Sequence, residues 1–220
     1  MHRYLICCFL LLVITTGCST NKPAPKQPPT ILETSASIFG LMGDFVESPA
    51  VEKYLAMIDL ISSDLKKGYI DNGDILHQAE ELLNKKQFAE SIKLLDSPEG
   101  LHSIIIPRYH LILAANYRAL NRTEEADAER SIFSLLLVAI SKSGDGSQAK
   151  PYRVLHVESQ YDFMKYWLKI ERSERRQQSL MHVDGRSYDM HELTSGRTIW
   201  FDITERMSIL RANISDTGKQ

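Results

Sequence analysis

Apolar residues recur at helical spacing through the first half of the chain. Between positions 49 and 67 they recur on one face of a helix, at Val51, Tyr54, Leu55, Ile58, Ile61 and Leu65. This spacing is typical of a helix with one buried face. Ser48 suits the N-cap of that helix, Pro49 its first position and Gly68 its end. The segment 31–47 is apolar but contains two glycines, which predicts a short helix or an irregular segment docked on the body.

Two further stretches have the pattern of helical hairpins. Residues 74–96 and residues 107–141 each contain two amphipathic helices. A polar break separates the two helices, at Lys85–Gln87 in the first stretch and at Asn121–Arg122 in the second. Aligned on their second helices, the stretches repeat with a period of about 35 residues, which predicts two copies of one structural unit.

The hairpins resemble the tetratricopeptide repeat, whose period is about 34 residues. Ala79, Ala115 and Ala126 match its small-residue positions, and the turn "LNRTEEA" is similar to the turn of that family. The resemblance implies stacked helices with a concave binding face. Two repeats do not bury their faces alone, so we expect the helix at 49–67 or the C-terminal unit to cap them. The alternative is an unrelated helical bundle with the same spacing.

The periodicity changes after the turn-forming segment 141–151. A strand is predicted at 152–158, followed by a short helix with Ser159 at its N-cap and a charged loop, "ERSERR". Further strands are predicted at 177–183, 187–193 and 198–204, separated by the hairpin dipeptides Asp184-Gly185 and Ser195-Gly196. The predicted fold class is therefore mainly α with a small α+β end: helical hairpins (TPR-like) packed on a C-terminal β-α-β-β-β meander.

The beginning of the chain predicts export. An apolar run from Tyr4 to Ile14 follows Arg3. It is shorter than the roughly 20 residues that a membrane-spanning helix needs, but it fits a secretory signal. The residues Thr16, Gly17 and Cys18 after it resemble the lipobox of bacterial lipoproteins. That resemblance implies cleavage before Cys18 and acylation of this cysteine, with palmitate as a typical chain. An ordinary signal peptide and an uncleaved N-terminal anchor are the alternatives.

The residues after the cysteine predict how the body is held. Ser19 resembles the sorting pattern of outer-membrane lipoproteins, which implies an outer-membrane location facing the periplasm. Residues 19–30 are rich in proline, which is typical of an extended spacer. The predicted organisation is a signal peptide (1–17), a lipid-anchored disordered linker (18–36), a helical repeat-like domain (37–146), an α+β domain (147–206) and a tail (207–220).

Charge and cysteine content exclude several classes of function. The formal net charge of −2 gives no electrostatic footprint for nucleic acid. The three cysteines are Cys7, Cys8 and Cys18, so a chain cleaved before Cys18 and acylated there has no free thiol. This excludes a disulfide scaffold, a thiolate metal site and a cysteine nucleophile. The sequence also lacks a Walker loop, a dinucleotide-binding glycine motif and a serine nucleophile elbow.

A broader resemblance covers residues 50–205. The segments "AISKSGDG", "YRVLHVESQYDFM", "SYDMHEL" and "IWFDIT" are similar to a secreted bacterial family described only as a domain of unknown function. The resemblance implies repeat-like helices ahead of an α+β tail, in a protein that acts outside the cytoplasm. It carries no catalytic residues, because none are established for that family.

The second half contains three sets of candidate residues. The loop Ser143–Ser147 is typical of a tight turn, with an anion nest or a cation held by Asp145 as alternatives. The histidines His156, His182 and His191 are numerous enough for an open zinc site, although they lack the H-E-x-x-H spacing. The aspartates Asp162, Asp184, Asp189 and Asp202 are numerous enough for acid–base hydrolysis of glycans. We expect neither of these two sites, because exposed or edge positions explain the histidines and ordinary hairpin and strand positions explain the aspartates.

We therefore expect a non-enzymatic envelope lipoprotein anchored to the membrane through Cys18. We expect no cofactor and no metal, and a protein or peptide partner bound by the helical hairpins. The polar positions on the candidate lining helices are Gln78, His110, Asn116 and Arg118. The alternative is a periplasmic hydrolase or small-ligand-binding protein that uses the C-terminal sheet. It requires convergence of at least two groups among His156, His182, Asp189 and Asp202.

Overall fold

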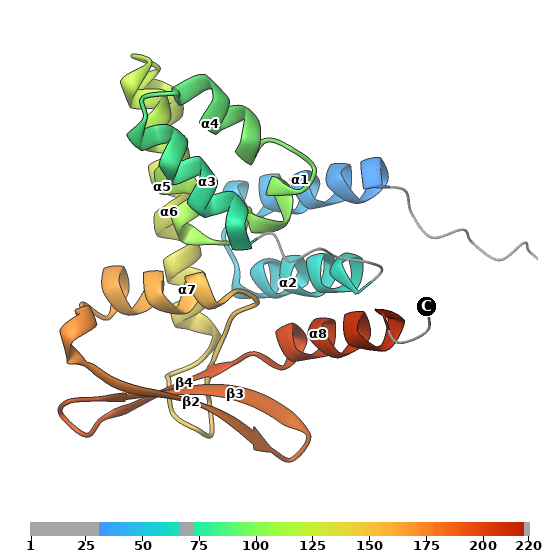
Figure 1. The fold of residues 1–220 in the computed structure, drawn as a ribbon, viewed down its shortest axis with the longest axis vertical. Coiled ribbons are helices and arrows are strands. Elements are labelled where there is room, and N and C mark those ends of the chain that lie inside the picture. Colours follow the sequence, from blue (N-terminus) through green and yellow to red (C-terminus); the bar gives the residue numbers. More distant parts are fainter. Residues whose placement is uncertain (1–30, 67–72, 218–220) are drawn as a thin grey trace, which may run out of the picture.

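The structure is a computed structural model that describes residues 31–66 and 73–217. The expected signal peptide, Cys18 and the proline-rich spacer lie outside the described residues. Within them, helical hairpins stand at one end of the molecule and a four-stranded sheet at the other, and three more helices run along one side (Figure 1). The predicted fold class, mainly helical with a small α+β end, is confirmed.

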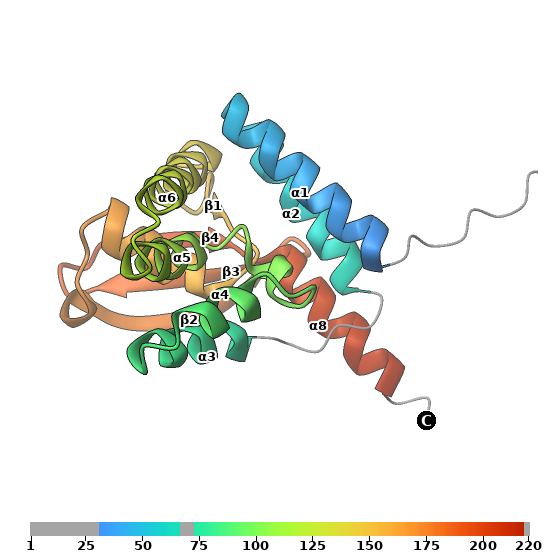
Figure 2. The same ribbon diagram turned by 90° about the horizontal axis from the view of Figure 1, so that it is seen from above.

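The first two helices run side by side along one edge of the molecule. These are α1 (Ile31–Glu47) and α2 (Val51–Leu65), whose pairing is clear from above in Figure 2. The linker predicted over 18–36 is wrong in its last part, because α1 already begins at Ile31 and buries Ile38 and Phe45 against the core. The predicted Ser48 cap is also wrong. The N-cap of α2 is Ala50, whose extended backbone turns the chain between the two helices.

The two predicted hairpins are present. The first consists of α3 (Gly73–Asn84) and α4 (Phe88–Leu95), and the second of α5 (Pro107–Ala119) and α6 (Thr123–Ser143). Their turns are alike: Lys86 and Asn121 have φ values of 60° and 59°. The amide after each donates to the carbonyl five residues earlier, at 2.8 and 2.9 Å. These are Schellman-type helix ends, and they place the same turn at the same point of each unit.

Buried polar contacts join the hairpins. The Ser91 hydroxyl on α4 donates to the carbonyl of Ala79 on α3 at 2.9 Å. The Asn116 amide nitrogen on α5 donates to the Ser91 hydroxyl at 2.8 Å and to the carbonyl of Ile112 at 2.9 Å. Ala79, Ser91 and Asn116 are fully buried. Their small size lets the three helices approach closely, and the hydrogen bonds satisfy the Ser91 hydroxyl and the Asn116 amide nitrogen.

The C-terminal unit has the predicted β-α-β-β-β order. Its elements are β1 (Tyr152–Arg153), α7 (Val157–Asp162), β2 (Arg175–Val183), β3 (Arg186–Leu193) and β4 (Thr198–Asp202). The spatial order is β1-β4-β3-β2. Strands β2, β3 and β4 form the predicted antiparallel meander, whereas β1 pairs with β4 in parallel.

The strand predicted at 152–158 is too long. After two paired residues the chain leaves the sheet, because Val154 and Leu155 are buried in the core. His156 then serves as the N-cap of α7 in place of Ser159, which lies buried inside the helix.

The end of α7 is irregular. The helix continues as a π-helical turn, η2 (Phe163–Trp167), and the chain then forms a short 3₁₀ turn, η3 (Arg172–Glu174), before β2. Phe163 is fully buried, with its ring 4.6 Å from that of Tyr152 and 6.3 Å from that of Phe201. These ring contacts fix η2 to the sheet.

A final helix, α8 (Thr204–Thr217), follows β4. Most of it falls in the segment 207–220 that was predicted only as a tail. It runs beside α2 (Figure 1). The Glu205 carboxylate accepts hydrogen bonds from the Ser62 hydroxyl and the Lys66 ammonium group, both at 2.8 Å. Residues far apart in sequence thus hold the two helices together.

One hydrophobic cluster extends through the described residues, from Ile38 on α1 to Ile209 on α8. It crosses the predicted boundary between residues 146 and 147 without interruption. Another short helix, η1 (Gly100–Ser103), joins the hairpins. Both expected caps are used, since α2 contacts α6 and α7 contacts α5. The hairpins and the sheet therefore share one core.

The turn at Lys86 allows a test of the hairpin geometry. A lysine in the left-handed region costs roughly 1 kcal/mol relative to glycine, so Lys86→Gly is expected to raise the free energy of unfolding by about 0.5–1 kcal/mol. The neighbouring variant Lys85→Gly, at an ordinary backbone conformation, is expected to lower it. Urea unfolding followed by circular dichroism compares the two. Equal destabilisation by both variants would contradict the left-handed turn.

Candidate functional site

A buried polar network lies between α7 and the sheet. The Gln160 side-chain amide nitrogen donates to Asp189 Oδ2 at 2.8 Å, and Gln160 Oε1 lies 2.8 Å from His191 Nε2. Because an amide oxygen only accepts, His191 Nε2 carries the proton. Gln160 is fully buried, and His191 is 1% exposed. The network fixes the orientation of the imidazole.

The environment of His191 keeps it neutral. Burial lowers the pKa of His191 to about 4; the nearby Arg175 acts in the same direction and Asp189 opposes it. A neutral imidazole with its proton on Nε2 has a lone pair on Nδ1. At neutral pH, His191 therefore adds no positive charge to the site and can accept a hydrogen bond at Nδ1.

A second buried carboxylate joins α7 to the hairpins. Asp162 is fully buried, and it accepts hydrogen bonds from the Arg108 backbone N–H at 2.9 Å and from Arg108 Nε and Nη2 at 3.1 and 2.9 Å. Burial raises the pKa of the Asp162 carboxyl, and the Arg108 guanidinium opposes that shift. Arg108 is thereby held in place with 35% of its side chain exposed.

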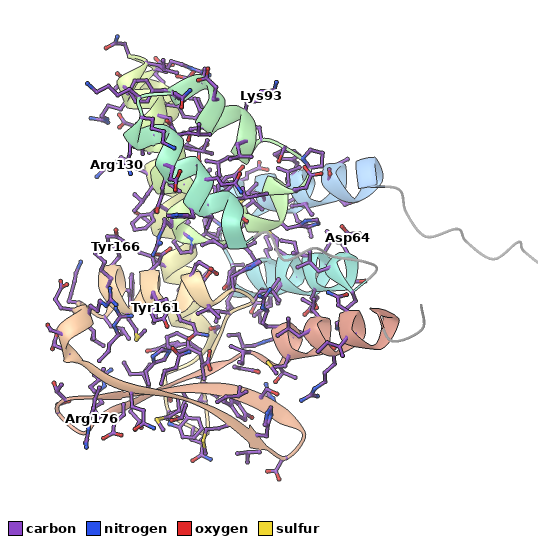
Figure 3. The ribbon with its side chains drawn as sticks, viewed as in Figure 1. Asp64, Lys93, Arg130, Tyr161, Tyr166 and Arg176 are labelled. Carbon is purple, nitrogen blue, oxygen red and sulfur yellow. The ribbon has the colours of Figure 1, made fainter. Side chains whose placement is uncertain are left out.

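A cavity with a volume of about 520 Å³ lies at this junction. We call it the arginine pocket, and its lining includes Arg108, Tyr161, Arg172, Arg175, Arg176 and His191. Figure 3 shows Tyr161 between the helices and the sheet, and Arg176 at the sheet edge. The pairing between β2 and β3 is irregular between Arg175 and Gln177. A bulge of this kind redirects side chains, and here it gathers consecutive arginines around one opening.

A second cavity, of about 450 Å³, lies between α3, α5 and η2. We call it the helical groove. Its apolar lining is formed by Leu83, Leu111, Ile112 and Tyr166, and its charged lining by Glu80, Arg108 and Lys165. The Tyr166 ring packs edge-on against Phe133, with centroids 5.3 Å apart. Arg108 belongs to both cavities, so the helical groove and the arginine pocket are adjacent.

The three candidate histidines are not brought together. His156 Nε2 bonds to the carbonyl of His102 at 3.1 Å, and His182 Nδ1 bonds to the Ser187 hydroxyl at 3.0 Å, away from His191. The residues that the structure describes contain no group of three side chains suited to hold a metal ion.

The four candidate aspartates are also separated. Asp162 pairs with Arg108, Asp184 lies in the β2–β3 turn, and Asp202 pairs with Arg186. In the β3–β4 register Tyr188 lies opposite Asp202 and Asp189 lies opposite Phe201. Because successive strand residues point to opposite faces, Asp189 and Asp202 lie on opposite faces of the sheet. They do not form a catalytic pair.

The polar residues expected along the concave helical face have other roles. His110 is buried, with its two ring nitrogens bonded to Glu129 at 2.6 Å and to the carbonyl of Ile104 at 2.8 Å. Asn116 is used within the hairpin contacts described above. Arg118 forms an exposed ion pair with Asp127, and Gln78 is exposed on α3. None of the four lines the helical groove.

The loop Ser143–Ser147 is a tight turn. Asp145 Oδ1 accepts from the Ser147 amide at 2.9 Å, and the amides of Asp145 and Gly146 donate to the carbonyl of Lys150 at 2.9 and 3.1 Å. These three amides are used within the turn and are not available to an anion nest.

The arginines of the pocket are absent from the candidates found in the sequence. Arg172, Arg175 and Arg176 belong to "ERSERR", which was predicted to be a loop. The structure places Arg172 on η3 and the other two on β2. Three arginines within five residues form the one local signal that points to this site. Their convergence with Arg108 depends on tertiary packing.

A scan against protein-family models and searches of curated proteins and of solved structures found no match for this chain. Among the described residues, no helix has the length and apolar character required to cross a membrane. The site is therefore interpreted from its own geometry.

The neutral state of His191 predicts a dependence of stability on pH. In the unfolded chain a histidine has a pKa of about 6.5, whereas the folded protein favours neutral His191 down to about pH 4. Above pH 6.5 the imidazole is neutral in both states, so the folded protein has its full stability there. This stability is lost as the pH falls from about 6.5 towards 4, by about 3 kcal/mol in total. Urea unfolding of the wild type at pH 7 and pH 4 measures the loss.

The matched variant is His191→Gln, whose amide nitrogen can still donate to Gln160. It is expected to lose less stability between the two pH values, because glutamine does not titrate. Other groups titrate in both proteins, so the difference between them isolates His191. Identical losses in the wild type and the variant would contradict the buried neutral imidazole.

Proposed function

We propose that this chain is a lipid-anchored protein of the bacterial envelope that binds a segment of a partner protein in the helical groove. The observation that carries the proposal is the adjacency of apolar and charged side chains in a cavity of about 450 Å³ between two hairpins. Binding sites for peptides commonly combine apolar anchor pockets with a polar rim. The helical groove has both features.

The lining of the groove specifies the chemistry of the partner segment. Leu111 and Tyr166 are half-buried, so they offer apolar surface that a partner side chain can cover. Glu80 lies 3.7 Å from Arg108 across the groove, and Lys165 is exposed at its rim. A segment with one or two large apolar anchors flanked by charges of both signs fits this surface.

The anchor belongs to the same proposal. The apolar run before Thr16, Gly17 and Cys18 supports a cleaved signal and a lipidated cysteine. Two or three acyl chains on one residue provide stable attachment without a spanning helix. The proline-rich residues after Cys18 would let the body reach a partner away from the membrane, on the periplasmic side of the outer membrane.

The proposed function is non-catalytic. The hydrolase alternative needs two converging groups among His156, His182, Asp189 and Asp202, and these four residues have separate partners. Binding of a small ligand near the sheet has a different basis, in the arginine pocket.

A charge placed in the helical groove is expected to abolish partner binding. Leu111→Glu exposes a carboxylate on the apolar lining, and a loss of about 1.4 kcal/mol or more corresponds to at least a tenfold weaker complex. A photo-crosslinking amino acid at Leu83 reports the complex in intact envelopes. We expect a discrete adduct with the otherwise unchanged chain and at least tenfold less of it when Leu111→Glu is added.

The control is Leu120→Glu, the same substitution at an exposed leucine at the end of α5. It is expected to leave the adduct unchanged. A crosslinker at the exposed Lys93 on α4 (Figure 3) should give no such adduct. Equal adducts at Leu83 and Lys93, or equal loss with both glutamate variants, would show that the helical groove is not the binding surface.

The anchor is tested separately. Cys18→Ser removes the acceptor for the acyl chains, so the protein should no longer incorporate labelled palmitate and should leave the membrane fraction after carbonate extraction. Ser19→Ala is the matched control and should retain both properties. A Cys18→Ser protein that still carries palmitate would refute lipidation at this residue.

A further inference from the structure

We propose that the arginine pocket binds a phosphoryl group carrying at least two negative charges, such as pyrophosphate or a phosphate monoester. The cavity volume of about 520 Å³ lies within the range of roughly 300–1,000 Å³ that is usual for small-ligand sites. The proposal goes beyond partner binding in the helical groove, because it assigns a separate ligand to a separate cavity.

The charge balance of the pocket leaves room for a dianion. Arg108 is paired with Asp162, and the Nη1 of Arg176 lies 2.9 Å from Glu192. Within the described ranges, 31–66 and 73–217, neither Arg172 nor Arg175 forms an ion pair. The neutral His191 adds no charge. Two of the four arginines therefore lack a carboxylate, although the chain as a whole is slightly acidic.

Arg175 is positioned for a ligand that the protein does not supply. Its guanidinium lies over the Tyr161 ring, 4.7 Å from the centroid. Its Nε is buried and, within the part of the chain that the structure describes, has no hydrogen-bond partner. A buried donor left unsatisfied costs about 1–3 kcal/mol. An anionic oxygen in the pocket would accept hydrogen bonds from the guanidinium group, which pairs with no carboxylate among the described residues.

The surroundings of Arg175 hold the pocket in shape. The Tyr161 hydroxyl donates to Gln178 Oε1 at 2.7 Å. This bond fixes both the ring that supports the guanidinium and the amide group of Gln178. Arg172 lies on η3, which is closed by a capping box between Glu171 and Glu174. The Thr194 amide donates to the Glu174 carbonyl at 2.8 Å and ties η3 to the β3–β4 hairpin. The Tyr161 ring, the Arg175 guanidinium and the backbone of η3 are thereby ordered before a ligand binds, so they lose less entropy on binding.

The arrangement of the donors favours a phosphoryl group over a carboxylate. One planar guanidinium satisfies a planar carboxylate through two parallel bonds. Here guanidinium groups come from three elements: α5, η3 and the beginning of β2. They reach one cavity from three separate elements, which suits the several oxygens of a tetrahedral phosphoryl group better than the two of a planar carboxylate. The phosphoryl group can belong to a soluble molecule or to a lipid headgroup, and the experiment distinguishes the two.

The experiment uses the full chain in neutral detergent micelles and isothermal titration calorimetry. The first arm titrates pyrophosphate, with citrate as a tricarboxylate comparator. The second arm adds phosphatidic acid to the micelles and measures the shift in the unfolding temperature of the protein. We expect saturable binding of pyrophosphate, or stabilisation by phosphatidic acid, and at least tenfold weaker binding of citrate.

The test variant combines Arg172→Gln with Arg175→Gln. It should raise at least tenfold the concentration of pyrophosphate, or of phosphatidic acid, that gives a half-maximal response. Arg172→Gln alone changes an exposed side chain, so it keeps the test valid if the double variant does not fold. The matched control is Arg130→Gln, at an exposed arginine on α6 far from the sheet (Figure 3). It should bind as the wild type does.

The possible outcomes distinguish a soluble ligand from a lipid headgroup. A response to pyrophosphate assigns a soluble phosphoryl ligand, and a response to phosphatidic acid alone assigns a lipid headgroup. Absence of both responses, equal binding of citrate, or unchanged binding by both arginine variants would overturn the proposal. These measurements use no variant of the helical groove, which the Leu83 crosslink reports separately, so failure of this site is distinguishable from failure of the groove.

Discussion

The ion pair between Arg108 and Asp162 is the contact on which the arrangement of this protein depends. Helix α5 begins with Pro107 and has Ile106 at its N-cap, which offers no side-chain hydrogen bond. The fully buried carboxylate at the end of α7 accepts the free backbone N–H of Arg108 and two N–H groups of its guanidinium. A negative charge at a helix N-terminus is stabilising because it offsets the helix dipole. One aspartate thus caps a helix that lies more than fifty residues earlier in the chain.

This contact explains why the two cavities are neighbours. It fixes the second hairpin against α7, and α7 is fixed to the sheet through Phe163 and through the hydrogen bonds of Gln160. Arg108 then stands at the border of the helical groove and the arginine pocket. The groove offers apolar surface between helices, whereas the pocket concentrates positive charge at the sheet edge. Taken together, the two proposals assign a partner segment and an anionic ligand to adjacent places on one protein.

Hydrophobic periodicity predicted the elements whose buried faces repeat. The hairpins were found because Ala79 and Leu95 in one unit and Ile112 and Ala126 in the other recur at helical spacing, and the meander because Ile199 and Phe201 alternate with polar residues. Helix α8 was missed because it buries Ile209 and little else, so its sequence has almost no apolar stripe. The beginning of α1 was missed because it adjoins the proline-rich spacer in sequence.

The site was harder to predict than the fold. Candidate aspartates were chosen by their closeness in sequence, but the strand register separates Asp189 from Asp202. The arginine pocket depends on a β-bulge and on the packing of α5 against α7, and neither is encoded in a local pattern. The cluster "ERSERR" carried the signal, but a charged segment between two predicted elements is usually a solvated loop. The position of Arg108, which only the folded structure gives, distinguishes a ligand pocket from a solvated loop.

The most direct test is a double-mutant cycle of Arg108→Gln and Asp162→Asn, with the free energy of unfolding measured in urea. If this buried pair holds the hairpins to the sheet, Asp162→Asn alone should cost about 3 kcal/mol, because the partly buried arginine keeps, among the described residues, only the more distant carboxylate of Glu80. The coupling free energy between the two sites should then exceed about 1 kcal/mol. Additive losses, with a coupling below about 0.3 kcal/mol, would contradict the central role of this contact.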